Sequence, residues 1–290
     1  MTDRVYLRFR SATDTMPLDR VSMNGYGVEA LKGVTGLGLP PVSTQWLTGA
    51  GDGATYRGER KQPRDIDVPL HILMPTRADL ELEMARLSRM VMNGPFDMDV
   101  VEASGNYWTN RVVRVGGGDF SYGEGTTGER ELTTVITVRG APYFTSYQEQ
   151  SEIVTNKGAG RGLLGAGFSL VSLKVAASQA IGDMLLRNEG DAPAYPVWRI
   201  TGPGKNLVVS DGARTFQWNG TLTAGEELII DTRRASVRTA AGASRYADLA
   251  PAPRFWRLEP GQTLAHVSLA STNSQSAIRC TWRPKKWWVI

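Results

Sequence analysis

The second half of the sequence constrains the fold most strongly, because short alternating segments follow one another there with tight turns between them. Leu207 and Val209 alternate with polar residues, Asp211-Gly212 gives a two-residue turn, and Phe216 and Trp218 alternate after it. Further strands are expected at residues 228–230, 236–238, 255–258, 263–269 and 277–283. No helical period longer than two turns occurs after residue 183, so these roughly eight short strands predict a β-sandwich.

The first half predicts strands around a single helix. Residues 65–74 alternate apolar and polar side chains with the period of a strand. A helix is expected at about residues 77–92, because Thr76 and Asp79 give a start signal and an apolar stripe follows until Asn93-Gly94-Pro95. Two further strands are expected at residues 97–103 and 107–115. The chain is therefore predicted to be mainly β, with an N-terminal β-barrel-like or sandwich-like domain that contains one helix.

Two glycine-rich segments interrupt the N-terminal elements. Residues 32–62 are expected to form a long irregular loop, and the presence of Trp46 and Tyr56 predicts that this loop packs on something. Residues 116–128, which include Phe120 and Tyr122, are expected to form the tip of a long hairpin. Two interpretations of this arm stay open: a merely mobile loop, or an arm that becomes ordered against a neighbouring subunit.

A third glycine-rich segment, residues 146–182, is interpreted as a linker between an N-terminal domain at 1–145 and a C-terminal domain at 183–290. Its run from Gly158 to Gly165 resembles a phosphate-binding loop only superficially. A dinucleotide site needs a strand, the loop and a helix within a βαβ unit, and no such pattern surrounds this run. A hinge is the favoured interpretation.

The residue types that catalysis needs are scarce. Cys280 alternates inward in its strand, and as the single cysteine it allows no internal disulfide. His266 falls on the solvated face of its strand, and His71 lies in the other predicted domain. Acidic pairs such as Asp97/Asp99 share one strand face, which is typical of a solvated sheet edge, whereas glycosidase carboxylates flank a cleft. We therefore expect no catalytic residue, no metal site and no cofactor, and a hydrolase is the least favoured function class.

The charge and hydropathy of the chain exclude other classes. The net charge is +4, divided into −2 for residues 1–140 and +6 for residues 141–290, without the dense basic stripe of a duplex-DNA binder. The most apolar stretch, residues 163–177, is shorter than the roughly 20 residues of a membrane-spanning helix. The first ten residues lack the apolar region of a secretory signal. We expect no membrane anchor.

The aromatic and basic run at residues 282–290 has two interpretations. It is either a last strand that seals the sandwich, which is favoured, or a surface that stacks on sugars or single-stranded nucleic acid. The second interpretation leads to an alternative function, a carbohydrate-binding adhesin for host cell-wall recognition. Its candidate glycan-contact residues are Trp218, Trp256, Trp287 and Trp288.

Several short motifs, in this order, resemble the distal tail protein (Dit) family of siphovirus-type phages. They are Gly36-Leu-Gly38-Leu-Pro-Pro41, Gly51-Asp-Gly53, Tyr56-Arg-Gly58, Arg64 to Leu70, Tyr107-Trp108 with Arg111, Arg139 to Phe144, Leu186 to Pro196, Ile229-Ile-Asp231 with Arg233, and Leu258 to Gly261. Each motif is mostly turn chemistry, and their order along nearly the whole chain carries the resemblance. The arm at residues 116–128 has no counterpart in this pattern.

The resemblance implies a structural, non-enzymatic virion protein that is made in the host cytoplasm and acts at the tail tip. It implies a homohexameric ring of N-terminal domains around a channel through which DNA passes without being specifically bound. The C-terminal domain would be a galectin-like β-sandwich that contacts a receptor-binding protein or host cell-wall glycan. The tail tube protein and the tail-associated lysin or tail spike hub would be the other partners. Candidate subunit-interface residues are Trp46, Tyr56, Arg57, Phe120 and Tyr122.

Overall fold

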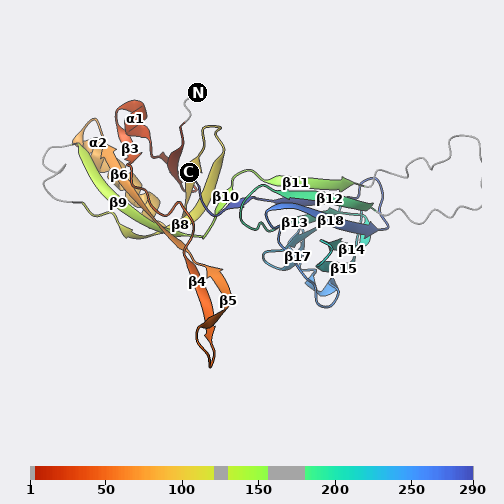
Figure 1. The fold of residues 1–290 in the computed structure, drawn as a ribbon. Helices are drawn as coiled ribbons and strands as arrows, with labels where there is room; N and C mark the ends of the chain where they lie inside the picture. Colours follow the sequence, from red (N-terminus) through yellow and green to blue (C-terminus); the bar gives the residue numbers. More distant parts are fainter. Residues whose placement is uncertain (1–3, 121–129, 156–179, 290) are drawn as a thin grey trace, which may run out of the picture. The chain divides into compact units, whose positions relative to one another are not determined.

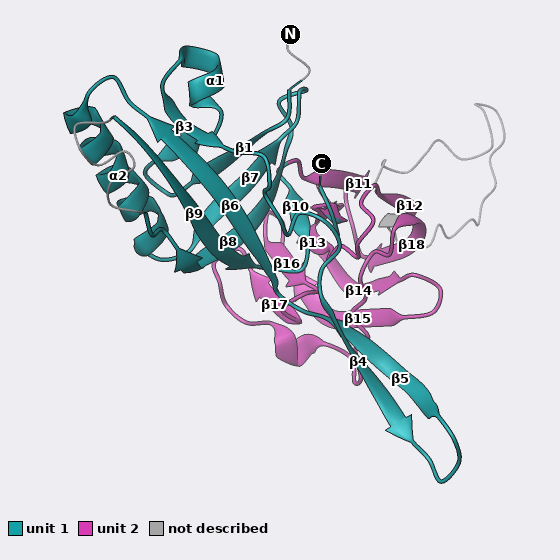
Figure 2. Cartoon of the chain, turned by 60° about the vertical axis from the view of Figure 1, so that its left-hand side comes forward, with its two compact units in different colours: residues 1–147, 286–290 teal, residues 148–285 magenta. Residues whose placement is uncertain are grey.

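The computed structural model describes residues 4–120, 130–155 and 180–289. The chain forms two compact units (Figure 2), unit 1 with residues 1–147 and 286–290 and unit 2 with residues 148–285. Unit 1 is therefore discontinuous in sequence, because the chain leaves it after Tyr147 and re-enters it at Lys286. Among the described residues, none of the helices has the length and apolar character needed to cross a membrane.

Unit 1 is built on a nine-stranded sheet that curls into a nearly closed, barrel-like layer (Figure 1). Its main path runs β2-β1-β7-β8-β9-β6-β3, with antiparallel neighbours, and β10 pairs with β8 and β20. The strands are β1 (Tyr6–Arg10), β2 (Thr15–Pro17), β3 (Gly27–Ala30), β6 (Arg64–Leu73), β7 (Phe96–Val101), β8 (Tyr107–Gly117), β9 (Glu131–Gly140), β10 (Phe144–Ser146) and β20 (Lys285–Lys286).

The core of unit 1 lies between this sheet and helix α2 (Arg77–Met92), the helix that the apolar stripe predicts. The Thr76 hydroxyl accepts the Asp79 backbone N–H at 3.2 Å, which caps the helix as expected for this start signal. Leu80, Leu87, Met90 and Val91 are its buried side chains. They pack with the alternate apolar residues of β6, which have no exposed surface. A short helix that the sequence did not reveal, α1 (Arg20–Asn24), precedes β3.

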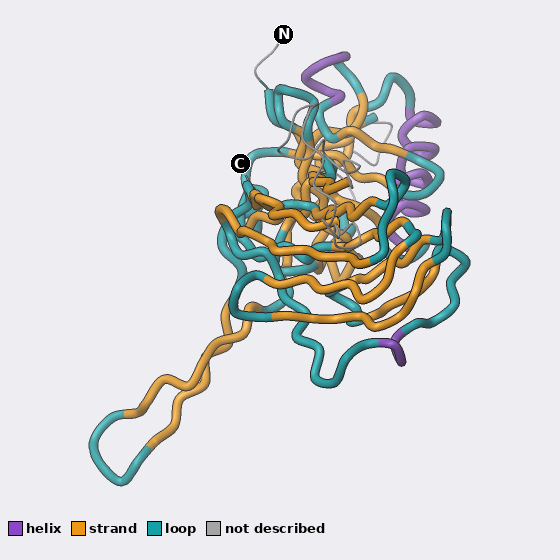
Figure 3. Tube along the Cα trace, turned by 90° about the vertical axis from the view of Figure 1, so that its right-hand side faces the viewer, coloured by secondary structure: helices purple, strands orange, loops and turns teal. Residues whose placement is uncertain are grey.

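The segment expected to be an irregular loop is instead a regular hairpin. Strands β4 (Val42–Thr48) and β5 (Ala54–Lys61) pair only with each other, in antiparallel register, and project from unit 1 (Figure 3). Every side chain of β4 is exposed. The expectation of an irregular loop was wrong because a strand with no buried face has no apolar alternation that could reveal it, whereas packing of this segment on a partner stays a prediction.

Unit 2 is a β-sandwich of antiparallel sheets, as the sequence predicted. One sheet has the order β11-β19-β13-β16-β17 and the other the order β12-β18-β14-β15. Their strands are β11 (Gln150–Thr155), β12 (Ala180–Asn188), β13 (Val197–Thr201), β14 (Gly204–Ser210), β15 (Thr215–Leu222), β16 (Glu227–Asp231), β17 (Ser236–Thr239), β18 (Gly261–Ala270) and β19 (Ala277–Trp282), with a 3₁₀ turn at Tyr246–Asp248. The predicted strand at 255–258 is absent as a strand and contributes one bridge, between Leu258 and Ala194.

The core of unit 2 combines side chains from both sheets. Trp198 of β13 packs edge-to-face against Trp256 at 5.8 Å and against Phe216 of β15 at 6.4 Å. Cys280 is fully buried in this cluster, as its alternation predicted, and His266 lies on the exposed side of β18. The aromatic side chains therefore fill the space between the sheets.

Unit 2 begins earlier in the sequence than the predicted start at 183. Strand β11 pairs with β19 over Gln150 to Thr155, so these residues belong to the sandwich and do not link the units. The interior of the predicted linker, residues 156–179, lies outside the described residues. At the other end, residues 286–289 leave the sandwich for unit 1, so the run that was interpreted as a sealing strand does this only as far as Trp282.

Candidate subunit interface

The hairpin of β4 and β5 carries the most exposed aromatic pair of unit 1. Trp46 and Tyr56 are direct cross-strand partners and therefore share one face of the hairpin. Their rings meet edge-to-face at 5.5 Å, while 60% of Trp46 and 47% of Tyr56 remain exposed. Arg57 follows at a β-bulge, where the register shifts between Gln45 and Trp46, and is also exposed. Aromatic side chains are enriched at protein interfaces, so this exposed pair is a candidate interaction surface.

The base of the hairpin is held by a buried cation. Arg64 occupies the first inward position of β6 and is 1% exposed. Its guanidinium donates to the carbonyl oxygens of Gly36 at 2.9 Å and Gly38 at 2.7 Å, and also to those of Pro142 and Trp287. Burial lowers the pKa of Arg64 to about 10, so the group stays charged at neutral pH. Carbonyl dipoles therefore compensate this charge.

The second predicted interface segment is only partly described. Phe120 is 49% exposed and follows β8. Tyr122 lies outside the described residues, as does the rest of the arm from residue 121 to residue 128. Among the described residues, the hairpin is therefore the larger exposed aromatic surface of the two predicted segments.

The outer face of the unit 1 sheet holds a charged cluster that the sequence interpretation missed. Asp99 is completely buried and accepts hydrogen bonds from Arg8 (2.6 and 3.0 Å), Arg10 (2.9 and 3.1 Å) and the Thr109 hydroxyl (2.8 Å). The interpretation of Asp97/Asp99 as a solvated edge pair was wrong, because β7 lies between β1 and β8 and the arginines of β1 cover Asp99. The sequence signal was that charged residues repeat at every second position both in β1 (Arg8 and Arg10) and in β7 (Asp97 and Asp99).

This cluster continues onto an aromatic pair. The Tyr107 ring lies 4.5 Å from the Arg8 guanidinium and stacks on Tyr147 at 4.3 Å. Burial raises the pKa of the Tyr107 hydroxyl, and the Asp99 hydrogen bonds raise the pKa of Arg10. The Arg10 guanidinium therefore stays charged near neutral pH, and the Tyr107 hydroxyl stays neutral.

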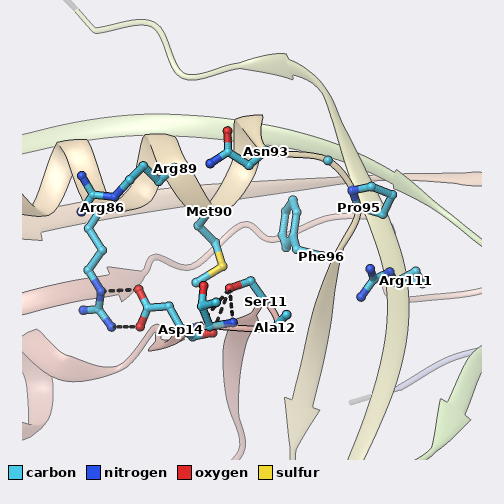
Figure 4. Close-up of a pocket in the computed structure, with 12 residues that line it drawn as sticks. Ser11, Ala12, Asp14, Arg86, Arg89, Met90, Asn93, Pro95, Phe96 and Arg111 are labelled. Carbon is cyan, nitrogen blue, oxygen red and sulfur yellow. Dashed lines mark hydrogen bonds and ion pairs between the residues drawn. The ribbon is translucent and has the colours of Figure 1, made fainter.

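A pocket of about 450 Å³ lies beside the C-terminal end of α2 (Figure 4). Arg86 of α2 makes two bonds of 2.7 Å to the carboxylate of Asp14, and this contact lowers the pKa of Asp14. Arg111 on the other side donates to Asp97 at 3.0 Å. Two of the three arginines that line the pocket therefore already have acidic partners, and the third, Arg89, stands exposed at its rim.

Two of the four tryptophans predicted to contact glycans cannot do so. Trp218 is fully buried and Trp256 is 2% exposed in the sandwich core, so neither ring presents a face to a ligand. Trp287 is half-buried and meets Tyr143 edge-to-face at 6.3 Å, and Trp288 is 43% exposed. Both belong to unit 1 and do not belong to the sandwich.

Groups suited to bond chemistry do not converge in the described part of the chain. Burial raises the pKa of the Cys280 thiol well above its ordinary value, which disfavours the nucleophilic thiolate. His266 contacts Asp183 at 2.6 Å on an exposed sheet face. Across residues 4–120, 130–155 and 180–289, His, Cys, Asp and Glu side chains form no group of three that could hold a metal ion.

Comparisons with known proteins give one family model and several solved structures that this chain resembles. Residues 189–287 match the family model described as the siphovirus-type tail component, C-terminal domain. The crystal structure of SPP1 Dit, described as a paradigm of the hub adsorption apparatus in phages that infect Gram-positive bacteria, superposes with a TM-score of 0.65 at 13% identity. The alignment covers 97% of this chain and 99% of SPP1 Dit. The baseplate of phage P2 in its activated conformation with Ca gives a TM-score of 0.49 at 10% identity, over 99% of this chain and 100% of that one. No curated protein matches the chain.

The sequence match is confined to residues 189–287 and is to the C-terminal domain of siphovirus-type tail components, and the superposition on SPP1 Dit shows a shared fold over nearly the whole chain. More particularly, the chain resembles the distal tail protein (Dit) family in the sequence of residues 189–287 and in its fold.

Proposed function

We propose that this protein is the distal hub adaptor of its tail, a homohexameric ring that joins the tail tube to the tail tip and leaves a channel for DNA. The observation that carries the proposal is the exposed Trp46–Tyr56 pair on a hairpin that projects from unit 1. A closed ring uses heterologous contacts, in which one patch meets a different patch on its neighbour. A projecting hairpin supplies one such patch.

The charges of unit 1 are compatible with a channel through which DNA passes unbound. Phosphate affinity comes chiefly from lysine and arginine side chains that are free to contact DNA. On the outer face of the sheet, Arg8 and Arg10 are bonded to Asp99, and Arg139 is bonded to Asp65 at 2.6 and 2.7 Å. If this face borders the channel, its guanidiniums are largely neutralised before DNA arrives.

We propose the remaining partners from the resemblance to distal tail proteins. The ring would contact the tail tube protein on one side and the tail-associated lysin or tail spike hub on the other. Unit 2 would contact a receptor-binding protein or host cell-wall glycan. We propose no enzymatic step and no cofactor, because the protein would act through the surfaces that it presents.

The double substitution Trp46→Ala with Tyr56→Ala, examined by light scattering of the full chain, tests the proposal. Wild-type protein should reach about 190 kDa, six times 31.6 kDa. Two interface aromatics at about 2 kcal/mol each should weaken assembly by several hundredfold, so the variant should sediment and scatter as smaller species.

The matched control is Tyr246→Ala in unit 2, because Tyr246 is as exposed as Tyr56, at 47%. This control should assemble like wild type. An unchanged mass for the hairpin variant, or an equal loss for the control, would contradict the assignment of the hairpin as the subunit contact.

A further inference from the structure

The return segment, defined here as residues 286–289, reaches the base of the hairpin. Val289 is 5% exposed within the core of unit 1, and its backbone N–H donates to the Leu37 carbonyl at 3.1 Å. The Trp287 carbonyl is one of the four that accept from Arg64. The Lys61 ammonium lies 6.0 Å from the centre of the Trp287 ring. The return segment thus touches both chain segments that lead into and out of the hairpin.

The hairpin depends on these contacts for its direction. Its two strands pair only with each other, and the base is closed by the Gln62 N–H donating to the Pro41 carbonyl at 2.8 Å. Beyond the base, the side chains of β4 are exposed, so they do not pack the hairpin against the rest of unit 1. The orientation of such a ribbon is set where it joins the barrel, which is where Arg64 and the return segment meet.

Arg64 connects the return segment to the hairpin base through shared carbonyl acceptors. No acidic residue forms an ion pair with it in the described ranges, so its buried charge is stabilised by carbonyl oxygens from the 36–38 loop, from Pro142 and from Trp287. A buried cation that loses an acceptor must recover it from water. Departure of the return segment would remove one acceptor and would draw water to the hairpin base.

Folding of unit 2 determines how close the return segment lies to the rest of unit 1. All of unit 2 lies between residues 147 and 286 in sequence. In the folded sandwich, β11 and β19 are neighbours, with Gln150 directly opposite Trp282. Folding of unit 2 therefore brings together the two points at which the chain leaves and re-enters unit 1, and it removes most of the entropy cost of closing that loop.

We propose that Arg64 and the return segment are positioning elements for assembly, which hold the hairpin in its assembly-competent direction only once unit 2 has folded. This inference rests on the proposed function for the role of the hairpin in assembly, and on contacts within unit 1 for the positioning itself. As a consequence, only a chain whose unit 2 has folded can assemble. A chain whose unit 2 is unfolded presents a poorly oriented hairpin and is excluded from the ring.

Hydrogen exchange on the full chain tests the positioning role with Val289→Asp and its matched control Trp288→Asp. Val289 is buried and bonded to the hairpin base, whereas the neighbouring Trp288 is 43% exposed. Val289→Asp should raise exchange of residues 36–41 and 61–64 at least tenfold and leave β6 beyond Arg64 protected. Trp288→Asp should change neither region. Disrupting the unit 2 core with Trp198→Ala should loosen the same hairpin-base residues.

Two results would overturn the inference. One is unchanged exchange at the hairpin base in Val289→Asp. The other is a uniform rise that includes β6 and α2, because this would show a general loss of stability in unit 1. A Val289→Ile variant should keep the wild-type protection, which distinguishes the apolar anchor from the mere presence of a substitution.

The failure of this inference is distinguishable from failure of the proposed function. Light scattering of Val289→Asp should show the same loss of assembly as the hairpin aromatic variant, and normal assembly despite a loosened base would overturn the positioning role. If wild-type protein never assembles, the proposed function is contradicted, while the exchange experiment still decides whether the return segment orders the hairpin.

Discussion

The buried carboxylate of Asp99 provides the sharpest quantitative prediction. Replacing it by Asn keeps the shape of the side chain but removes the charge that faces Arg8 and Arg10. Asp99 accepts four N–H bonds from these guanidiniums between 2.6 and 3.1 Å, and its side chain has no exposed surface. Removing one partner of a buried ion pair costs about 3–5 kcal/mol, because the remaining charges stay desolvated. We expect Asp99→Asn to lose about 3 kcal/mol, since Asn retains one acceptor oxygen.

The matched control is the same Asp→Asn substitution in a solvent-exposed ion pair. Asp65 and Arg139 form a bidentate pair at 2.6 and 2.7 Å on the same sheet face, but the two side chains are 46% and 54% exposed. An exposed pair contributes about 1 kcal/mol or less, so Asp65→Asn should be nearly silent. Urea unfolding, with the unit 1 transition identified by hydrogen exchange in β7, measures both losses. Equal losses, or a loss below 1 kcal/mol for Asp99→Asn, would refute the burial argument.

Three further predictions concern pH, the pocket and glycans. Burial lowers the pKa of Lys285 to about 8 from an unfolded value of 10.5, so the unfolded chain binds more protons between these values. The free energy of unfolding should therefore rise with pH across that window, by up to about 3 kcal/mol, and urea titration of Lys285→Met should lack this rise. Because Arg86 lowers the pKa of Asp14, the stabilisation from this pair should disappear as pH falls through the folded-state value, and Asp14→Asn should flatten the acid limb of a melting-temperature profile. On a glycan array, Trp218→Phe should leave any signal unchanged, since the ring is buried; a lost signal in a variant that remains folded would contradict that placement.

The periodicity of apolar residues was sufficient to predict the helices and strands that bury one face and expose the other. The α2 stripe, the β6 alternation and the inward Cys280 each follow from side chains that repeat with the period of their element. The hairpin of β4 and β5 escaped prediction because both faces are in water and no pattern distinguishes them from a loop.

The features that depend on distant partners could not be derived from local sequence. The burial of Asp99 depends on Arg8 and Arg10, which precede it by about 90 residues and reach it only through the pairing of β1 with β7. An exposed and a buried tryptophan also have the same local signature, so the sequence predicted a surface role for both Trp218 and Trp46, although Trp218 is fully buried and Trp46 is 60% exposed. The return of residue 289 to unit 1 likewise follows from tertiary packing alone.

Native mass spectrometry of the purified full chain tests the central claim most directly. A protein that works by tiling copies of itself should give a dominant species of about 190 kDa, six protomers of 31.6 kDa, and a six-fold annulus in negative-stain images. A single species at 31.6 kDa, both in solution and when mixed with isolated tail tubes, would contradict the account.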